Sequence, residues 1–204
     1  MMPRAGAVAT RIRGGPFAGQ LVSDFSAGSN LDAGKHQRCW VHLLRDLHKL
    51  QEEHVEEDDV VAWEGAVRPL YSEGQAVVRG EEAASQEARE AKQVEGGERA
   101  EVLGLEVAQR PEHACKAVAR RILRHEGELF QFVLIEGLSA DNNLGERSIR
   151  PEVVVRTISG GTMSAEGSKT RMALASLFET WQARGLDPFE ECLKLLRQTP
   201  LPQL

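Results

Sequence analysis

Residues 140–161 read A-D-N-N-L-G-E-R-S-I-R-P-E-V-V-V-R-T-I-S-G-G and set an acidic side chain among amides and arginines. Asp141 suits the N-cap of a helix and Pro151 suits its end, so the segment predicts a short helix. An acid, two amides and a guanidinium can share one face of that helix: Asn142, Asn143, Glu146 and Arg150. Polar side chains grouped in this way are typical of a functional site rather than of a core.

The chemistry of this face permits two interpretations. A carboxylate can bind a hard divalent cation, while neighbouring amides and guanidinium groups hold phosphate oxygens, and phosphodiester chemistry uses both. The alternative is an ordinary exposed helix on which Glu146 and Arg150 form a solvated ion pair four residues apart. The spacing alone leaves both open.

Two blocks upstream carry further polar residues: L-V-S-D-F at residues 21–25 and K-H-Q-R-C-W-V-H-L-L-R-D-L at residues 35–47. Gln20–Ser23 is predicted to be a short strand that presents Asp24 at its carboxyl end, where α/β sheets place site residues. Residues 35–41 are predicted to be a second strand. An amphipathic helix is predicted from the apolar spacing of Trp40, Leu43, Leu44, Leu47 and Leu50.

Residues 141–162, together with E-G-S-K-T-R at residues 166–171, resemble the C-terminal part of the catalytic domain of bacterial DDE transposases of the insertion sequence 66 family. The two upstream blocks resemble the second-aspartate region of the same family and occur in the family's order. The resemblance covers nearly the whole chain, and residues 72–113 match loosely.

The resemblance implies an α/β, ribonuclease-H-like domain in which two aspartates and a glutamate hold two Mg²⁺ (or Mn²⁺) ions. These ions serve DNA cleavage and strand transfer at transposon ends. Asp24 stands at the second aspartate and Glu146 at the glutamate, so both are expected to be catalytic and to bind metal. Residues 1–23 contain no acidic residue, which leaves the first aspartate without a counterpart. We therefore expect a partial, N-terminally truncated domain that is inactive alone.

The expected organisation is helix-rich and has three parts. Residues 1–54 form a partial ribonuclease-H-like core, residues 55–134 a helical insertion, and residues 135–204 the rest of the catalytic domain with its closing helices. Residues 72–113 contain few large apolar side chains and predict loose helices or disorder. Glycines are expected to break this stretch at Gly74, Gly80, Gly96, Gly97 and Gly104. A buried stripe is expected to follow at Val118, Ile122, Leu129, Phe130 and Val133.

Beyond the site helix, residues 160–162 (G-G-T) predict either a plain turn or a turn whose backbone N–H groups approach phosphate. Ser164 or Ser168 is expected to cap the next helix, and Asp187 with Glu190 the last one. Buried faces are predicted on these two helices at Leu174, Leu177, Phe178 and Trp181 and at Phe189, Cys192, Leu193 and Leu196.

Charge along the chain favours DNA contact in the C-terminal third. The formal net charge is −6, yet residues 147–171 hold five basic and two acidic residues, and the acids gather at residues 52–59. Contact is expected through phosphates rather than bases. The side chains expected to bind DNA phosphates are Asn142, Asn143, Arg147, Arg150, Arg156, Lys169 and Arg171.

A second constellation consists of His36, Cys39 and His42, with His48 beyond. These residue types suit Zn²⁺, but the spacing offers no clear fourth ligand and a strand-to-helix change would splay the side chains. The resemblance implies instead that Cys39 and His42 shape the active site. A buried Cys39 beside a hydrogen-bonded His42, with no role in the site, is the alternative.

Composition indicates one or two domains: 204 residues, 41% hydrophobic and 27% charged. No apolar run reaches the roughly 20 residues that span a bilayer, and no signal peptide is recognisable, so we expect a cytoplasmic protein. Three separated cysteines predict reduced thiols. The expected partners are transposon-end DNA and, further, full-length transposase or a second copy of the chain. The alternative function is a non-enzymatic remnant that binds DNA or a full-length transposase.

The resembling blocks also depart from the family pattern. Ser26 and Ser29 stand where aromatic residues usually follow the second aspartate, and Gly145 stands where alanine is usual. A glycine inside a helix costs about 1 kcal/mol relative to alanine. Both departures favour a chain that is not selected for activity.

Overall fold

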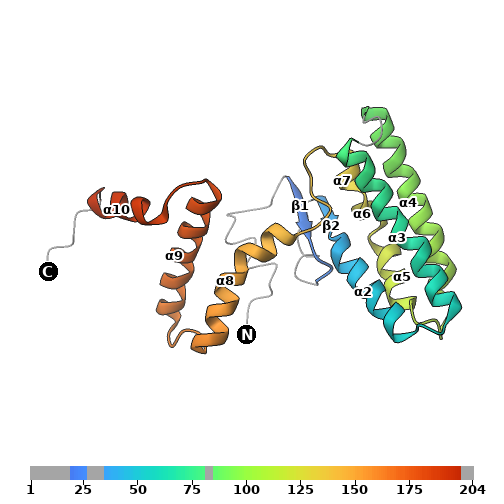
Figure 1. The fold of residues 1–204 in the computed structure, drawn as a ribbon, viewed down its shortest axis with the longest axis horizontal. Coiled ribbons are helices and arrows are strands. Elements are labelled where there is room, and N and C mark those ends of the chain that lie inside the picture. Colours follow the sequence, from blue (N-terminus) through green and yellow to red (C-terminus); the bar gives the residue numbers. More distant parts are fainter. Residues whose placement is uncertain (1–18, 27–34, 81–84, 199–204) are drawn as a thin grey trace. The chain divides into compact units, whose positions relative to one another are not determined.

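A computed structural model describes residues 19–26, 35–80 and 85–198 of the chain, which is helix-rich (Figure 1). The chain divides into two compact units, Met1–Asn142 and Asn143–Leu204. The first unit contains the sheet and the long helices α3 and α4, and the second contains α8, α9 and α10. Among the described residues, no helix is long and apolar enough to cross a membrane.

A short parallel sheet begins the described part of the first unit. Strands β1 (Gln20–Ser23) and β2 (Lys35–Arg38) pair from Gln20 with Lys35 to Ser23 with Arg38. Strand β1 has the predicted bounds. Helix α2 (Trp40–Glu53) follows, and its apolar stripe is confirmed because Trp40, Leu43 and Leu47 are buried. The second strand is shorter than predicted. It ends at Arg38, and the chain turns into α2 at Trp40, whose N–H donates to the carbonyl of Ala140.

Five further helices lie in the described part of the first unit: α3 (Asp58–Arg79), α4 (Gln86–Ala108), α5 (Lys116–Arg124), α6 (Glu126–Leu129) and α7 (Gln131–Leu134). Helices α3 and α4 run side by side, and α4 also packs against α5 and α7 (Figure 1). The stripe predicted from Val118 to Val133 is confirmed, because all five of its apolar residues are buried. These residues share one core with the apolar face of α2.

The glycines of α3 and α4 serve packing rather than interruption. A Cβ on Gly74 would lie 2.7 Å from the Phe132 ring, and one on Gly96 would lie 2.7 Å from the Phe130 ring. Gly104 makes the same close approach to Leu123, again at 2.7 Å. Of the glycines in residues 72–113, Gly80 alone ends a helix, with φ of 74°. The prediction of helices broken at the other four is wrong, because α3 and α4 continue through them.

The described residues of the second unit form α8 (Asn143–Ser159), α9 (Ala165–Ala183) and α10 (Pro188–Gln198). Helix α8 runs through Pro151, so the prediction that this proline ends it is wrong. An internal proline removes one backbone hydrogen bond and strains the helix without necessarily stopping it, and α3 likewise continues through Pro69. The helix begins at Asn143, so Asn142 rather than Asp141 directly precedes it.

The caps predicted at the starts of α9 and α10 are confirmed. Ser164 Oγ accepts from the N–H of Gly167 at 3.0 Å and caps α9. Asp187 Oδ1 accepts from the N–H groups of Phe189 and Glu190, at 2.8 and 3.3 Å, at the start of α10. These bonds satisfy N–H groups that have no partner within the helix.

The apolar faces predicted to be buried on α9 and α10 are not buried. Leu174, Leu177 and Phe178 are 37–46% exposed, and Phe189 and Leu196 are 66–68% exposed. No residue from 143 to 197 is buried. The predicted apolar periodicity is present, but no described element of the second unit covers it.

Candidate functional site

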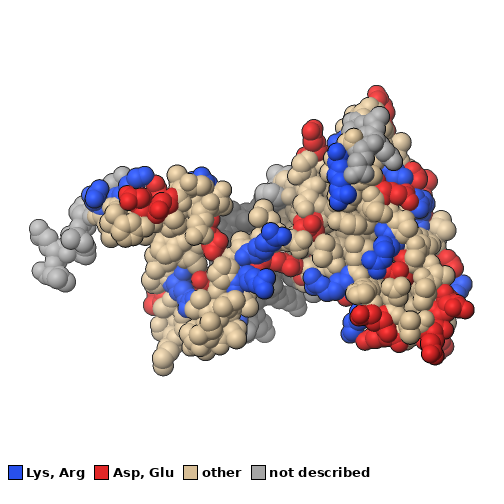
Figure 2. Space-filling view, viewed as in Figure 1, with Lys and Arg blue, Asp and Glu red and all other residues tan. Residues whose placement is uncertain are grey.

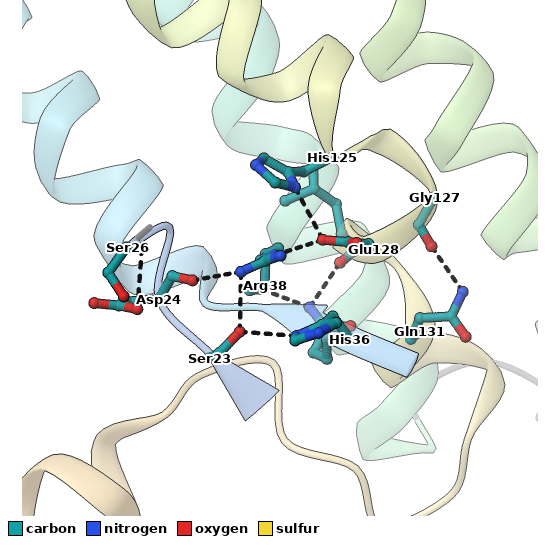
Figure 3. A network of polar contacts seen from close by, with 11 residues as sticks. Ser23, Asp24, Ser26, His36, Arg38, His125, Gly127, Glu128 and Gln131 are labelled. Carbon is teal, nitrogen blue, oxygen red and sulfur yellow. Dashed lines mark hydrogen bonds and ion pairs between the residues drawn. The ribbon is translucent and has the colours of Figure 1, made fainter. Parts of the chain in front are cut away.

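Asp24 lies directly after β1, at the carboxyl end of the parallel pair (Figure 3). Its Oδ1 accepts from the N–H of Ser26 at 3.1 Å, and its backbone carbonyl accepts from Arg38 Nη1 at 2.8 Å. The side chain is half-buried. One hydrogen bond therefore orients the carboxylate and the other holds the backbone carbonyl, at the edge where α/β sheets present ligands.

Cys39 connects the end of β1 to the segment that leads into α8. Its N–H donates to the carbonyl of Ser23 at 2.9 Å, and its Sγ accepts from the N–H of Asn142 at 3.4 Å. The neighbouring N–H of Trp40 donates to the carbonyl of Ala140 at 2.9 Å. Cys39 and Trp40 are fully buried, so the last residues before α8 are held beside the residue that precedes Asp24.

Glu146 lies in the first turn of α8, and Asn143 and Arg150 fall on the same face. Asn143 and Glu146 are half-buried, whereas Arg150 and Arg147 are exposed. A carboxylate in the first turn is favoured by the helix dipole. Asp24 belongs to the first unit and Glu146 to the second, so a shared site of the two stays a prediction.

The second unit contains a cavity of about 570 Å³ that is lined by two of the seven predicted phosphate ligands. Arg156 and Arg171 line it together with the turn at residues 160–162, whose two glycines have positive φ. Arg171 Nε forms an ion pair with Glu152 at 2.7 Å. Lys169 is outside the cavity lining and pairs with Glu166 at 2.7 Å.

Acidic side chains gather on the first unit at residues 52–59, where α2 gives way to α3 (Figure 2). All six acidic residues of this stretch are exposed: Glu52, Glu53, Glu56, Glu57, Asp58 and Asp59. Phosphates are repelled by such a surface. DNA is therefore expected to avoid this end of the unit.

The histidine and cysteine constellation has protein partners. His36 Nδ1 contacts Ser23 Oγ at 3.2 Å, and the exposed His48 pairs with Glu52 at 3.5 Å. His42 lies half-buried on α2. Within residues 19–26, 35–80 and 85–198, no three His, Cys, Asp or Glu side chains are grouped as a metal site. Cys39 Sγ accepts from the N–H of Asn142, and the role of Cys39 and His42 in shaping the site stays a prediction.

A buried polar network behind Asp24 was missed by sequence reasoning. It joins Arg38 of β2 to Glu128 and His125 of the helical segment (Figure 3). The neighbouring Gln37 is fully buried and exchanges hydrogen bonds with Leu129 and Phe132. A usable signal was present in the sequence, because a strand that reads K-H-Q-R can be buried only if its polar groups find partners elsewhere.

Comparison with known proteins identifies the chain's relatives. A profile of the transposase IS66 family matches residues 2–170. The uncharacterized protein y4qI of Sinorhizobium fredii is 30% identical over 203 residues, which cover 91% of this chain and 36% of that protein. The chain thus spans little more than a third of this relative's length, and no solved structure matches it. The chain belongs to the IS66 family of transposases.

Proposed function

We propose that the chain carries the second aspartate and the glutamate of a ribonuclease-H-like DDE transposase domain, which cleaves and joins DNA at transposon ends. In this proposal residues 1–54 and 135–204 belong to the catalytic domain and residues 55–134 form its helical insertion. The expected partner is transposon-end DNA, and the expected location is the cytoplasm. Family membership supports the class of protein.

The observation that carries the proposal is the attachment of residues 140–142 to the corner at Cys39 and Trp40. Cys39 itself is bonded to the carbonyl of Ser23, next to Asp24. Glu146 follows Asn142 by four residues, a rise of about 6 Å along a helix. These contacts lie within the first unit and hold Asn142, the residue directly before α8, beside the end of β1, which is what supports the proposed shared site.

The donor set fits a hard divalent cation. Asp24 and Glu146 would hold Mg²⁺ or Mn²⁺ through carboxylate oxygens, which both ions prefer. When bound, the metal supplies a Lewis acid that activates water or a DNA 3′-hydroxyl for in-line attack.

The remaining polar residues, from Asn142 onward, position DNA. Asn142 and Asn143 offer amide groups, and Arg147 and Arg150 offer exposed cations on the glutamate helix. The cavity with Arg156, residues 160–162 and Arg171 has the size and the donors to take a backbone phosphate. Arg171 is partly neutralised by Glu152, so Arg156 is expected to contribute the larger attraction.

A polypeptide of these 204 residues is expected to lack catalytic activity alone. No acidic residue precedes Asp24, so one metal ion lacks a charged ligand. A loss of about 4 kcal/mol in transition-state stabilisation slows a reaction about 10³-fold. The alternative function, a non-catalytic protein that binds DNA or a full-length transposase, is favoured by the exposed apolar faces of α9 and α10.

Metal-directed cleavage of the protein tests the shared site. Fe²⁺ with ascorbate and peroxide produces hydroxyl radicals that cut the backbone beside a bound ion. We expect cuts near Asp24 and near Glu146 in one sample, and loss of both cuts in Asp24→Asn. Glu179→Gln, which changes an acid on α9, serves as the matched control and should keep both cuts. Cuts at only one of the two segments would contradict a shared metal site.

DNA cleavage tests the predicted inactivity. The purified chain is mixed with transposon-end DNA and Mn²⁺, with Glu146→Ala as the control. No strand cleavage is expected. Cleavage that disappears in Glu146→Ala would support the transposase chemistry and contradict the inactivity of the 204 residues, since a third ligand would then come from elsewhere. Retained DNA binding without cleavage in both proteins would favour the non-catalytic alternative.

A further inference from the structure

Arg38 is a buried cation that contacts both the aspartate strand and the helical segment (Figure 3). Its side chain is 2% exposed. Nη1 donates to the carbonyl of Asp24 at 2.8 Å and to Ser23 Oγ at 3.2 Å, while Nε donates to Glu128 Oε2 at 2.5 Å. One guanidinium therefore bridges three acceptors from two parts of the chain, which its planar fork of donors allows.

The contact to Asp24 occurs where the sheet has ended. Ser23 and Arg38 are the last paired residues of β1 and β2, so the carbonyl of Asp24 lies beyond the ladder. The guanidinium of Arg38 takes the place of a further strand residue as donor to that carbonyl. The peptide that carries the proposed metal ligand is thus fixed by a side chain rather than by sheet pairing.

Glu128 balances the charge of Arg38. Burial tends to raise the pKa of Glu128, but hydrogen bonds and charges from Arg38 and His125 outweigh it and hold that pKa below its ordinary value. Burial lowers the pKa of His125 despite its hydrogen bond to Glu128, whose Oε2 lies 2.9 Å from His125 Nδ1. Arg38 is the partner of Glu128 that stays charged at every physiological pH.

The segment that carries Glu128 is itself attached to β2 and α2. Gln37 donates to the carbonyl of Leu129 at 2.9 Å and accepts from the N–H of Phe132 at 2.8 Å. Trp40 Nε1 donates to the same carbonyl of Leu129 at 2.6 Å. These bonds cross about 90 residues of sequence and hold Glu128 at a fixed distance from the sheet.

We propose that Arg38 is the positioning residue of Asp24 and that Glu128, from the segment between α5 and α7, holds Arg38 in place. This inference rests on the proposed function, since it concerns the aspartate of the same metal site. It also makes residues 125–132 part of the support of that site. Groups that orient a metal ligand contribute about 10- to 100-fold to metal affinity.

Three variants test the inference: Arg38→Gln, Arg38→Lys and Glu128→Gln. Arg99→Gln is the matched control, because Arg99 pairs with Glu73 between α3 and α4 in the same unit. Two quantities are measured: the Mn²⁺ dissociation constant, and the ¹³C chemical shift of the Asp24 carbonyl in metal-free protein. The carbonyl shift reports the hydrogen bond from Arg38 without requiring metal or activity.

Arg38→Gln is expected to weaken Mn²⁺ binding at least tenfold and to move the Asp24 carbonyl shift. Arg38→Lys keeps the charge and should restore part of both, because an ammonium cannot span all three acceptors. Glu128→Gln should change the Mn²⁺ affinity and the Asp24 carbonyl shift in the same direction as Arg38→Gln, but by a smaller amount. Arg99→Gln should change neither quantity. If Arg38→Gln does not fold, the other two variants decide.

Two results separate this inference from the proposed function. Equal Mn²⁺ affinity and an unchanged Asp24 carbonyl shift in all three variants would overturn the positioning role while leaving the metal site intact. Absence of Mn²⁺ binding to the unsubstituted chain would count against the proposed metal site. The carbonyl shift would then still decide whether Arg38 fixes the Asp24 peptide.

Discussion

Helices α4 and α9 have similar lengths, 23 and 19 residues, but differ in what surrounds them. Helix α4 buries Gly96, Ala100, Gly104 and Val107 against its neighbours, whereas α9 buries no residue. Both begin with a serine that caps the first turn, Ser85 and Ser164. Local signals thus suffice to specify a helix in either unit, but only the first unit uses its helices to enclose a core.

The source of stability follows from this difference. The first unit has aromatic side chains in contact, such as Trp40 with Phe130 and Tyr71 with Phe132. Among its described residues, the second unit has caps, mostly exposed ion pairs and one aromatic pair, Phe178 with Trp181. Exposed ion pairs contribute about 1 kcal/mol or less each. Cooperative unfolding should therefore be governed by the first unit.

The largest expected effect compares two phenylalanines. Phe132 is 1% exposed, and Phe178 is 37% exposed. We expect Phe132→Ala to lower the free energy of unfolding by about 3–5 kcal/mol, because loss of the ring leaves a cavity beside Gly74. Phe178→Ala should cost about 1 kcal/mol or less. Urea unfolding followed by tryptophan fluorescence measures both, and equal losses would contradict the assignment of the core to the first unit.

Two adjacent glycines in α4, Gly96 and Gly97, should respond to alanine with stability changes of opposite sign. A Cβ on Gly96 would lie 2.7 Å from the Phe130 ring, whereas one on Gly97 would meet nothing within 4 Å. Gly96→Ala should destabilise by about 1–3 kcal/mol because it overpacks the contact. Gly97→Ala should stabilise by up to about 1 kcal/mol through helix propensity. Gly145→Ala in α8, also unobstructed, should resemble Gly97→Ala. If thermal unfolding gives Gly96→Ala the same stability change as the other two variants, the close contact between Gly96 and the Phe130 ring is refuted.

The smallest expected effect concerns the thiols. Cys39 and Cys115 are fully buried, while Cys192 of the second unit is half-buried. Burial, with the charges of Asp59, Glu57 and Glu64, raises the pKa of Cys115 to about 11 from 9.0. A thiol reagent at pH 8 should label Cys192 first and leave the other two unmodified until the protein unfolds. Rapid labelling of Cys115 in the folded protein would contradict this environment.

The same thiol gives a pH dependence with a defined sign. In the unfolded chain Cys115 loses its proton near pH 9, but the folded protein keeps it until about pH 11. The unfolded state then binds fewer protons, so the free energy of unfolding should fall as the pH rises from 9 to 11. Cys115→Ala should flatten this part of the stability profile. An unchanged slope in that variant would show that another group titrates.

Features specified by nearby residues could be predicted from the sequence. The strand before Asp24, the apolar stripe of α2 and the caps at Ser164 and Asp187 each depend on a few neighbours in the chain. Pro151 was misjudged because a helix can continue past one missing hydrogen bond. The exposed face of α9 was misjudged because periodicity shows which side is apolar without showing what covers it.

The contacts that hold the candidate site could not be predicted in the same way. Arg38 meets Glu128 across 90 residues, and Asn142 meets Cys39 across 103 residues, so both pairs exist only after the chain folds. The glycine faces of α3 and α4 depend on rings from other segments, Phe132 and Phe130. In each case the residue type was visible, but its partner was fixed by tertiary packing.

Cross-linking between Asp24→Cys and Glu146→Cys tests the central claim most directly, namely that the aspartate and the glutamate belong to one metal site. Cys192→Ser removes the accessible thiol, and Cys39 and Cys115 are buried. Paired metal ions lie about 4 Å apart, so their ligands should be within reach of a bis-maleimide that spans about 10 Å. We expect an intramolecular cross-link in this protein and none when Glu166→Cys on α9 replaces Glu146→Cys. Absence of the cross-link in folded protein, or equal cross-linking of the control pair, would contradict the shared site.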